Sequence, residues 1–474
     1  MKNLTVKDIV KCTEGTLLNG KESTTCEKFS KDTRTITKGD IYIGIKGENF
    51  DGNLFWKDAL DKGADGIIVQ DIDFKEEEIK KYKDKTIIKV KDTLKALYKI
   101  ASYKRNLFDG TVIAITGSVG KTSTKDIVAN TVSQKFITLK TKGNNNNNIG
   151  LPFTILNSPK ETEVMVLEMG MNHFGEISLL SKIAKPNICI ITNIGTSHIG
   201  NLGSRENILK AKLEILEGSD NPYIIINNDN DLLHKWYEEN KRKYNIKTYG
   251  IQNQSDIMAK DIELKEESSN FEIYLNNKEE KITVPVGGEH FILNSLCAIS
   301  VGVILDIKTE EIKRGIESFK LTKNRMEITE LKNGIKIIND AYNSSLESVK
   351  AALEYMNNIK ANRRIAVLGD VLETGEFAKE LHKKIGEAVE KNDVDILICS
   401  GENSKYIVEK ARDTNINEKN SDKKIIYYLE KKEDIIDLLK HILEPEDVVL
   451  FKASNGMKFF EIAEEVERWG YAKM

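Results

Sequence analysis

The sequence predicts an α/β protein of three domains, and two observations support that prediction. The chain has 474 residues, too many for one hydrophobic core, and about 150 residues per domain suggests three domains. Short runs of β-forming residues alternate with helical stretches, which is typical of sheets covered by helices. We expect a small N-terminal α/β domain at 1–92, a central domain at 93–320, and a C-terminal domain with a doubly wound sheet at 321–474.

The charge balance and the cysteines limit the classes of function. Lys and Arg total 71 against 74 Asp and Glu, so the chain lacks the basic excess of a nucleic-acid-binding protein. Its five cysteines are scattered without a C-x-x-C pair, which indicates reduced, mostly buried thiols and no zinc site. Neither a signal peptide nor a run of about 18 apolar residues is apparent, so we expect a cytoplasmic protein without membrane insertion.

The expected N-terminal domain contains a polar loop that could bind a ligand. Its strands are predicted at 41–45, 66–69 and 86–90. The segment 32–52 is rich in Thr, Gly and Asp, and Thr33, Arg34 and the amides near Gly47 could contact a polar ligand. Ordinary turn chemistry explains the same residues equally well, so both interpretations stay open.

The most informative stretch is the predicted strand, turn and helix at 111–132, TVIAITGSVGKTSTKDIVANTV. The two glycines of the turn let the backbone approach a ligand closely, so amides of the turn and of the helix N-terminus can converge on phosphate oxygens. Lys121 would neutralise charge on the β- and γ-phosphates, and the Thr122 hydroxyl would reach Mg²⁺. A strict P-loop has glycine where this chain has Ile115, and a plain strand-to-helix turn is the alternative. The predicted phosphate-binding residues are Gly117, Ser118, Val119, Gly120, Lys121, Thr122 and Ser123.

Two further strand ends of the central domain carry candidate metal ligands. Glu168 closes the apolar run 164–168. Because ligands bind at the carboxyl ends of parallel strands, Glu168 is a candidate Mg²⁺ ligand, with a solvated carboxylate as the alternative. His198 follows the apolar run 188–192, where a lone histidine is more often structural than functional.

Lys212 occupies an unusual position in the predicted helix 204–218. At about 100° per residue, the apolar residues of this helix form one arc with Lys212 in its middle, whereas Lys210 falls on the polar side. A lysine in such an arc either extends to the surface or is desolvated, which lowers its pKa and leaves a neutral, reactive amine. Extension to the surface is the more common outcome.

Asparagines are the remaining polar candidates of the central domain. The segment GNNNNNIGLP at 143–152 is either a solvated loop or a source of amide groups for polar substrate atoms. The helix predicted at 291–305 is apolar nearly all round and should be buried. Its Asn294 is the exception and therefore needs a partner.

Residues 321–328 are interpreted as a linker into the C-terminal domain. Four apolar runs predict its doubly wound sheet, at 334–340, 365–370, 395–400 and 447–451. The strand ends carry Asp340 and Asp370, followed by Glu373 and His382.

Together, four motifs resemble those of the Mur ligases of bacterial cell-wall synthesis, and the resemblance covers nearly the whole chain. They are the T-G-x-x-G-K-T turn, G-N-x-N-N-x-I-G-L-P at 143–152, E-M-G-x-N-H-x-G-E-I at 168–177, and D-A-Y-N at 340–343. The last two are similar to those of the family member that joins D-alanyl-D-alanine to UDP-N-acetylmuramoyl-tripeptide. The resemblance implies a ligase that uses ATP, Mg²⁺ and these two substrates through an acyl-phosphate intermediate, and we expect a monomer.

The resemblance also implies a fold, and two alternatives to this function stay open. It implies a P-loop-type ATPase sheet in the central domain and a Rossmann-like sheet in the C-terminal domain. One alternative is a folylpolyglutamate synthase, which shares the phosphate turn and the modified lysine. The other is a nucleotide-gated binding protein that hydrolyses ATP slowly as a switch.

The resemblance assigns roles to particular residues. With Lys121, the catalytic residues would be Glu168 and His198 as Mg²⁺ ligands, and Lys212 as a carbamylated lysine that helps to hold a second metal ion. ATP would be contacted by Asn294, Arg325 and Asp340. The uridine diphosphate pocket would be formed by Thr33, Arg34, Gly47 and Asp51, and further substrate contacts by Asn146, Asn147 and Asn343.

The chain departs from the family pattern at three places. Residues 51–53 read D-G-N where D-G-H is usual, and residues 344–346 read S-S-L where A-x-P commonly follows D-A-Y-N. Residues 452–456 read K-A-S-N-G and lack the arginine of a common K-G-S-R-G segment. These departures concern the uridine and dipeptide contacts and leave the expected ATP chemistry unchanged.

Overall fold

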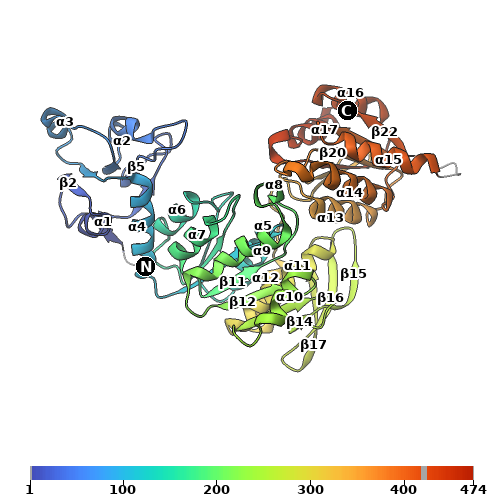
Figure 1. The fold of residues 1–474 in the computed structure, drawn as a ribbon, viewed down its shortest axis with the longest axis horizontal. Helices are drawn as coiled ribbons and strands as arrows, with labels where there is room; N and C mark the ends of the chain where they lie inside the picture. Colours follow the sequence, from blue (N-terminus) through green and yellow to red (C-terminus); the bar gives the residue numbers. More distant parts are fainter. Residues whose placement is uncertain (1–2, 418–423, 473–474) are drawn as a thin grey trace. The chain divides into compact units, whose positions relative to one another are not determined.

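A computed structural model describes residues 3–417 and 424–472 (Figure 1). The chain forms two compact units. Unit 1 comprises the chain up to Thr116 together with Lys135–Ile190 and Leu213–Ile224. Unit 2 comprises Gly117–Gln134, Ile191–Lys212 and the chain from Ile225 onwards. Within the described ranges, no helix is long and apolar enough to cross a bilayer.

The N-terminal part of unit 1 is a five-stranded sheet in the order β2-β7-β6-β5-β4. Its strands are β2 (Thr16–Asn19), β4 (Lys28–Ser30), β5 (Asp40–Ile43), β6 (Gly66–Val69) and β7 (Thr86–Lys89), and a separate pair is formed by β1 (Leu4–Thr5) and β3 (Thr25–Cys26). The helices are α1 (Val6–Thr13), α2 (Trp56–Asp61) and α3 (Glu76–Lys81). The three predicted strands are β5, β6 and β7, which pair in parallel around a core that includes Tyr42, Trp56 and Ile67. The predicted small α/β domain is confirmed.

The central sheet has seven strands in the order β14-β13-β12-β11-β8-β10-β9. They are β8 (Thr111–Thr116), β9 (Thr138–Lys140), β10 (Val164–Glu168), β11 (Ile188–Ile191), β12 (Tyr223–Asn227), β13 (Ile246–Gly250) and β14 (Ile257–Met258). The helices of this region are α4 (Thr93–Asn106), α5 (Lys121–Val132), α6 (Gly150–Leu156), α7 (Glu176–Ala184), α8 (Ile199–Leu202), α9 (Arg205–Leu213), α10 (Asp231–Asn240), α11 (Glu289–Ile304) and α12 (Thr309–Glu317). In unit 1, β8 and β10 pair in parallel with Glu168 opposite Ile115. Both strands therefore end at the same edge, as the alternation of strands and helices predicts.

Between Lys260 and Val284, an antiparallel sheet replaces the expected alternation of strands and helices. It consists of β15 (Lys260–Leu264), β16 (Ser269–Leu275) and β17 (Lys278–Val284). Along β16, every second residue is buried, which is the period of a strand with one covered face. Asn276 and Asn277 connect β16 to β17 with φ of +51° and +63°, the conformation of a two-residue hairpin turn. The prediction of continued alternation is wrong for this segment, because the two-residue period of β16 and the paired asparagines favour a β-hairpin.

The C-terminal part of unit 2 is a six-stranded sheet in the order β18-β19-β23-β20-β21-β22. Its strands are β18 (Glu327–Glu330), β19 (Lys336–Asn339), β20 (Arg364–Gly369), β21 (Ile396–Ser400), β22 (Ile425–Tyr428) and β23 (Val448–Lys452). Its helices are α13 (Leu346–Asn357), α14 (Ala378–Glu390), α15 (Lys405–Asn417), α16 (Lys432–Ile442) and α17 (Phe460–Ala472). All neighbouring strands are parallel except the edge strand β18. The predicted doubly wound sheet is confirmed, and the carboxyl ends of β19, β23 and β20 lie at one edge.

A buried lysine of unit 1 has an unusual proton affinity. Lys104, on α4, is almost fully buried, and its Nζ donates a hydrogen bond to the carbonyl of Leu156, 2.6 Å away, at the end of α6. Burial lowers the pKa of Lys104 to about 8 from its ordinary value of 10.5. Between these values the unfolded chain binds more protons than the folded chain. The contribution of Lys104 to stability therefore decreases as pH falls from about 10.5 towards 8.

We expect the stability difference between the native protein and the Lys104→Met variant to depend on pH. Relative to the variant, the free energy of unfolding of the native protein should rise by about 2 kcal/mol between pH ~7.5 and pH ~9.5. Urea unfolding at both pH values measures this difference in the free energy of unfolding. Other groups that titrate in this range contribute equally to the native protein and the variant, so the comparison removes their contribution. A difference that does not change with pH would contradict the assignment.

Candidate active site

The turn between β8 and α5 has a backbone that requires glycine at two positions. Gly117 has φ of +152°, and a Cβ atom on it would lie 1.8 Å from Thr192 Oγ1. Gly120 has φ of +82° and directly precedes α5. Neither the conformation nor the space at Gly117 accepts a side chain. Positive φ therefore favours glycine at both positions of the predicted phosphate turn, and the close approach of Thr192 adds a steric reason at Gly117.

The segment after β11 holds this turn in place. The backbone amides of Ser118 and Val119 donate to Asn193, to its carbonyl at 3.0 Å and to its Oδ1 at 2.9 Å respectively. Lys121, the first residue of α5, folds back so that its Nζ donates to the carbonyl of Gly117 at 2.8 Å. A cation therefore lies over the turn at a helix N-terminus, where the helix dipole also favours an anion. Thr122 follows within the first turn of the helix and is buried, whereas Ser123 is half-buried.

Asn294 of α11 lies beside the same turn. Its Oδ1 accepts a hydrogen bond of 2.9 Å from the Thr124 hydroxyl, and a Cβ on Gly120 would lie 3.2 Å from that oxygen. Its Nδ2 is buried and has no hydrogen-bond partner among the described residues. Asn294 therefore has the partner that its buried position required. Its Nδ2 group keeps its N–H donors for a ligand, which would relieve the cost of leaving buried donors unpaired.

Lys212 is buried and does not extend to the surface. It lies in the last turn of α9 with an exposed fraction of 1%, and no described residue forms an ion pair with it. Burial, and secondarily the charge of Lys121, hold the pKa of Lys212 well below its ordinary value. The helix is shorter than predicted, because α9 ends at Leu213 and a 3₁₀ turn continues to Gly218. Lys212 therefore has the less common of the two outcomes, a buried and desolvated amine whose charged form is disfavoured.

His198 is paired with a carboxylate from the C-terminal part of unit 2. Its Nδ1 lies 2.5 Å from Glu373 Oε2, and the backbone amide of Gly200 donates to the Glu373 carbonyl at 3.0 Å. His198 and Glu373 both have positive φ, +63° and +59°, which is uncommon for residues other than glycine. The pairing uses Nδ1 and orients the imidazole, and the second ring nitrogen, Nε2, takes no part in it.

In unit 1, Glu168 ends β10 as a buried carboxylate. Its Oε1 accepts a hydrogen bond of 2.8 Å from Asn146 Nδ2, and its backbone amide donates to the Thr141 hydroxyl at 3.0 Å. The Oδ1 atom of Asn147 accepts from the backbone amides of Ile149 and Gly150 at 3.1 Å and 2.8 Å. Asn146 therefore orients Glu168, and Asn147 holds the loop that leads into α6. Direct substrate contacts of the two asparagines stay a prediction.

The residues predicted for the uridine diphosphate pocket make local turn contacts. The Arg34 guanidinium is 85% exposed and binds Asp32, with 2.6 Å between Nη2 and Oδ2, and this pairing lowers the pKa of Asp32 to about 2. Asp51 Oδ1 accepts from the backbone amide of Asn53 at 2.9 Å, and Gly47 donates to the carbonyl of Phe50 at 2.8 Å. Thr33 donates to Asp58 and helps to lower the pKa of that carboxyl. The ligand role of this loop stays a prediction.

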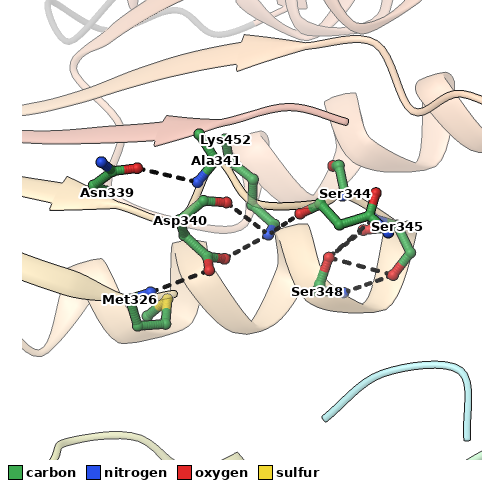
Figure 2. Close-up of polar contacts among 9 residues, drawn as sticks. Met326, Asn339, Asp340, Ala341, Ser344, Ser345, Ser348 and Lys452 are labelled. Atoms are coloured by element: carbon green, nitrogen blue, oxygen red, sulfur yellow. Dashed lines mark hydrogen bonds and ion pairs between the residues drawn. The ribbon is translucent and has the colours of Figure 1, made fainter. Parts of the chain in front are cut away.

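Two predicted site residues of the C-terminal part, Asp340 and Asn343, form one hydrogen-bonded group with Lys452, and Figure 2 shows the contacts around Asp340. Lys452 Nζ lies 2.5 Å from Asp340 Oδ2 and 3.1 Å from the carbonyl oxygen of Asn343. Asp340 Oδ1 accepts a hydrogen bond of 3.1 Å from the backbone amide of Met326, which follows Arg325 directly. The group sits where the neighbouring strands β19 and β23 end.

Sequence reasoning found no role for Lys452 and no partner for Glu373. A signal for Lys452 was present, since it closes the apolar run 447–451 in the way that Glu168 closes its own strand. The pairing of Glu373 with His198 joins residues 175 positions apart, and no local pattern predicts it. The other two strand-end candidates are structural. Asp370 accepts from the amide of Ser404 at 2.7 Å ahead of α15, and His382 Nε2 accepts from the amide of Val371 at 3.0 Å.

The site combines three features: parallel strands that end at a glycine turn, a lysine over that turn, and a buried amine. These features are typical of an α/β enzyme that uses a nucleoside triphosphate. Models of Mur ligase domains match most of the chain. The Mur ligase family catalytic domain matches residues 29–105, the Mur ligase middle domain residues 115–302, and the Mur ligase glutamate ligase domain residues 324–455. The chain belongs to the Mur ligase family, and it is an ATP-dependent ligase that forms an amide bond.

Relatives and solved structures agree with this assignment over nearly the full length. The UDP-N-acetylmuramoyl-tripeptide–D-alanyl-D-alanine ligase of Bacillus subtilis is 35% identical over 98% of both chains. The enzyme of the same name from Rickettsia prowazekii is 34% identical over 93% of this chain and 95% of its own. A crystal structure of MurF from Acinetobacter baumannii superposes with a TM-score of 0.87 at 26% identity, covering 99% of both chains. MurF ligase from Thermotoga maritima in complex with ADP gives 0.81 at 30% identity, covering 95% of this chain and 99% of its own.

Proposed function

We propose that the enzyme joins D-alanyl-D-alanine to UDP-N-acetylmuramoyl-tripeptide in the synthesis of peptidoglycan precursors. The observation that supports this most is the buried amine of Lys212, electrostatically coupled to Lys121 of the phosphate turn, in a chain whose full-length relatives carry that name. The proposal assigns ATP to the turn at 117–123 together with Asn294, Arg325 and Asp340. It assigns the nucleotide sugar to the N-terminal domain.

The reaction consists of two transfers. A carboxylate oxygen of the tripeptide attacks the γ-phosphorus of ATP, the bond from that phosphorus to the bridging oxygen breaks, and ADP leaves. The amine of D-alanyl-D-alanine then attacks the carbonyl carbon of the acyl phosphate, loses a proton, and phosphate leaves as the amide forms. Lys121 and the turn amides reduce the repulsion between the anionic nucleophile and the triphosphate, mainly by positioning and charge stabilisation.

The residues present suit a magnesium site completed by the nucleotide. Among the described residues, no group of three or more His, Cys, Asp or Glu could hold a metal ion. Of the proposed ligands, Thr122, His198 and carbamylated Lys212 belong to unit 2 and would be joined by phosphate oxygens of the nucleotide, as is usual for Mg²⁺. Glu168 of unit 1 stays a predicted ligand. The contact from His198 to Glu373 fits this role, because metal-binding histidines commonly hold a carboxylate with their other nitrogen. When bound, Mg²⁺ supplies charge neutralisation and alignment of the phosphates.

Phosphate release with substrates supplied one at a time tests the proposal. We expect release only when ATP, UDP-N-acetylmuramoyl-tripeptide and D-alanyl-D-alanine are all present, with L-alanyl-L-alanine as the matched inactive amine. Mass spectrometry should then find the tripeptide precursor extended by the dipeptide. Phosphate release that does not depend on the amine would indicate a nucleotide switch. Phosphate release that requires glutamate and a folate would indicate a folylpolyglutamate synthase.

A further inference from the structure

Lys452 is a buried cation whose donors are all directed at one loop. Its exposed fraction is 1%, and its Nζ contacts three oxygens of the segment after β19. They are Oδ2 and the carbonyl of Asp340, at 2.5 Å and 3.4 Å, and the carbonyl of Asn343, at 3.1 Å (Figure 2). An ammonium group has three N–H donors, so this arrangement uses all of them. Lys452 therefore fixes both the carboxylate and the backbone of the loop that contains Asp340.

Asp340 in turn holds the linker that enters the C-terminal sheet. Its Oδ1 accepts from the backbone amide of Met326 at 3.1 Å. Met326 has φ of +52° and Asn324 has φ of +60°, so Arg325 stands between two non-glycine residues in the left-handed conformation. Such residues are strained and persist only where neighbouring groups hold them. Hydrogen bonds do so here, because Asn339 Nδ2 donates to Asn324 Oδ1 at 3.1 Å.

The strained turn presents a guanidinium that is not fully satisfied. The centre of the Arg325 guanidinium lies 4.1 Å from the centre of the Tyr342 ring, which is a stacking contact. The Nε atom of Arg325 is buried without a hydrogen-bond partner in the part of the chain that the structure describes. A rigid, stacked cation with an unpaired donor is suited to bind an anionic or acceptor-rich ligand.

We propose that Lys452 is a positioning residue for nucleotide binding, acting through Asp340 and the Asn324–Met326 turn on Arg325. Lys452 holds the Asp340 carboxylate, the carboxylate holds the Met326 amide, and the turn keeps Arg325 stacked on Tyr342. This inference rests on the proposed function in one respect, namely that Arg325 and Asp340 contact ATP. It adds a residue that touches no substrate and yet sets the affinity for the nucleotide.

The test replaces Lys452 by methionine and measures ADP affinity by titration calorimetry with magnesium present. We expect the Kd for ADP and the KM for ATP to rise roughly tenfold or more, since a buried carboxylate that loses its cation reorganises. The KM values for the other two substrates should change less than about twofold. Hydrogen exchange of the peptide covering 322–328 should accelerate, because the Met326 amide loses its fixed acceptor.

The matched control is Arg363→Met, which removes the partly exposed cation that pairs with another buried carboxylate of the same sheet. Asp447 is fully buried, contacts Arg363 with 2.6 Å between Oδ2 and Nη2, and directly precedes β23, whereas Lys452 ends that strand. Arg363→Met should lower stability without changing the Kd for ADP or exchange at 322–328. The double variant Asp340→Asn/Lys452→Met removes both charges and keeps an acceptor for Met326, so it should exchange more slowly at this turn than Lys452→Met.

Native ADP affinity and native protection of the turn in Lys452→Met would overturn the inference. Equal loss of ADP affinity in Arg363→Met would do the same, since it would indicate a general effect of stability. Failure of the proposed function has a different signature, because the native enzyme would then not extend the tripeptide precursor by the dipeptide, while its ADP affinity would still respond to the replacement of Lys452.

Discussion

Replacing Lys212 by alanine is expected to reduce the rate of amide formation by roughly a thousandfold, the scale seen when an electrostatic stabiliser is lost from an active site. The side chain is buried, and its pKa is held well below the ordinary value by burial and by Lys121. A neutral amine is the form that reacts with CO₂, and the carbamate that forms is an anion suited to a magnesium site. Without the amine, neither the carbamate nor its charge can form. Steady-state turnover with all three substrates measures the loss.

Lys210→Ala is the matched control, because Lys210 is exposed on the polar side of the same helix. It should keep turnover within about twofold, as expected for a surface substitution. Bicarbonate should not restore Lys212→Ala, whereas short carboxylic acids that fill the space of the side chain should restore part of the activity. A ¹³C carbonyl signal after incubation with labelled bicarbonate should appear in the native enzyme and be missing in the variant. Unchanged turnover in Lys212→Ala would remove the carbamate role.

For Lys212, helical periodicity predicted the face of the helix on which the side chain lies. The helical period placed Lys212 within an apolar arc, and that placement is confirmed by its burial. Periodicity could not decide between a buried amine and one that reaches the surface, because that depends on what packs over the helix. The same holds for Asn294. The apolar helix predicted that its amide is buried, but it did not predict the contact with Thr124, 170 residues away.

Other features required contacts that no local pattern contains. The parallel sheets followed from short apolar runs, whereas the hairpin of β16 and β17 was missed although alternation and two asparagines signalled it. The pair of Lys452 and Asp340 joins neighbouring strands that are 112 residues apart in sequence. Strand ends could be recognised from the sequence, but the strand order that makes two of them neighbours could not.

Gly117→Ala is expected to weaken nucleotide binding by roughly a hundredfold, which corresponds to about 2.7 kcal/mol. A Cβ at this position would lie 1.8 Å from Thr192 Oγ1 and 3.2 Å from the Thr192 backbone nitrogen, so rotation of the Thr192 side chain cannot relieve all of the contact. The backbone at φ of +152° is also strained for any L-residue. The turn must therefore move, and its amides with it. ADP titration calorimetry measures the change in Kd.

Two further variants separate the steric effect from the backbone effect. Gly63 has φ of +107° with nothing within 4 Å of an added Cβ, so Gly63→Ala carries the conformational strain alone. It should lower the free energy of unfolding by about 1–2 kcal/mol and leave the Kd for ADP unchanged. The double variant Gly117→Ala/Thr192→Ala removes the closest contact and should recover only part of the affinity, because the backbone nitrogen of residue 192 remains. Native affinity in a folded Gly117→Ala protein would show that nucleotide phosphates do not bind at this turn, and the assignment of ATP to residues 117–123 would then be wrong.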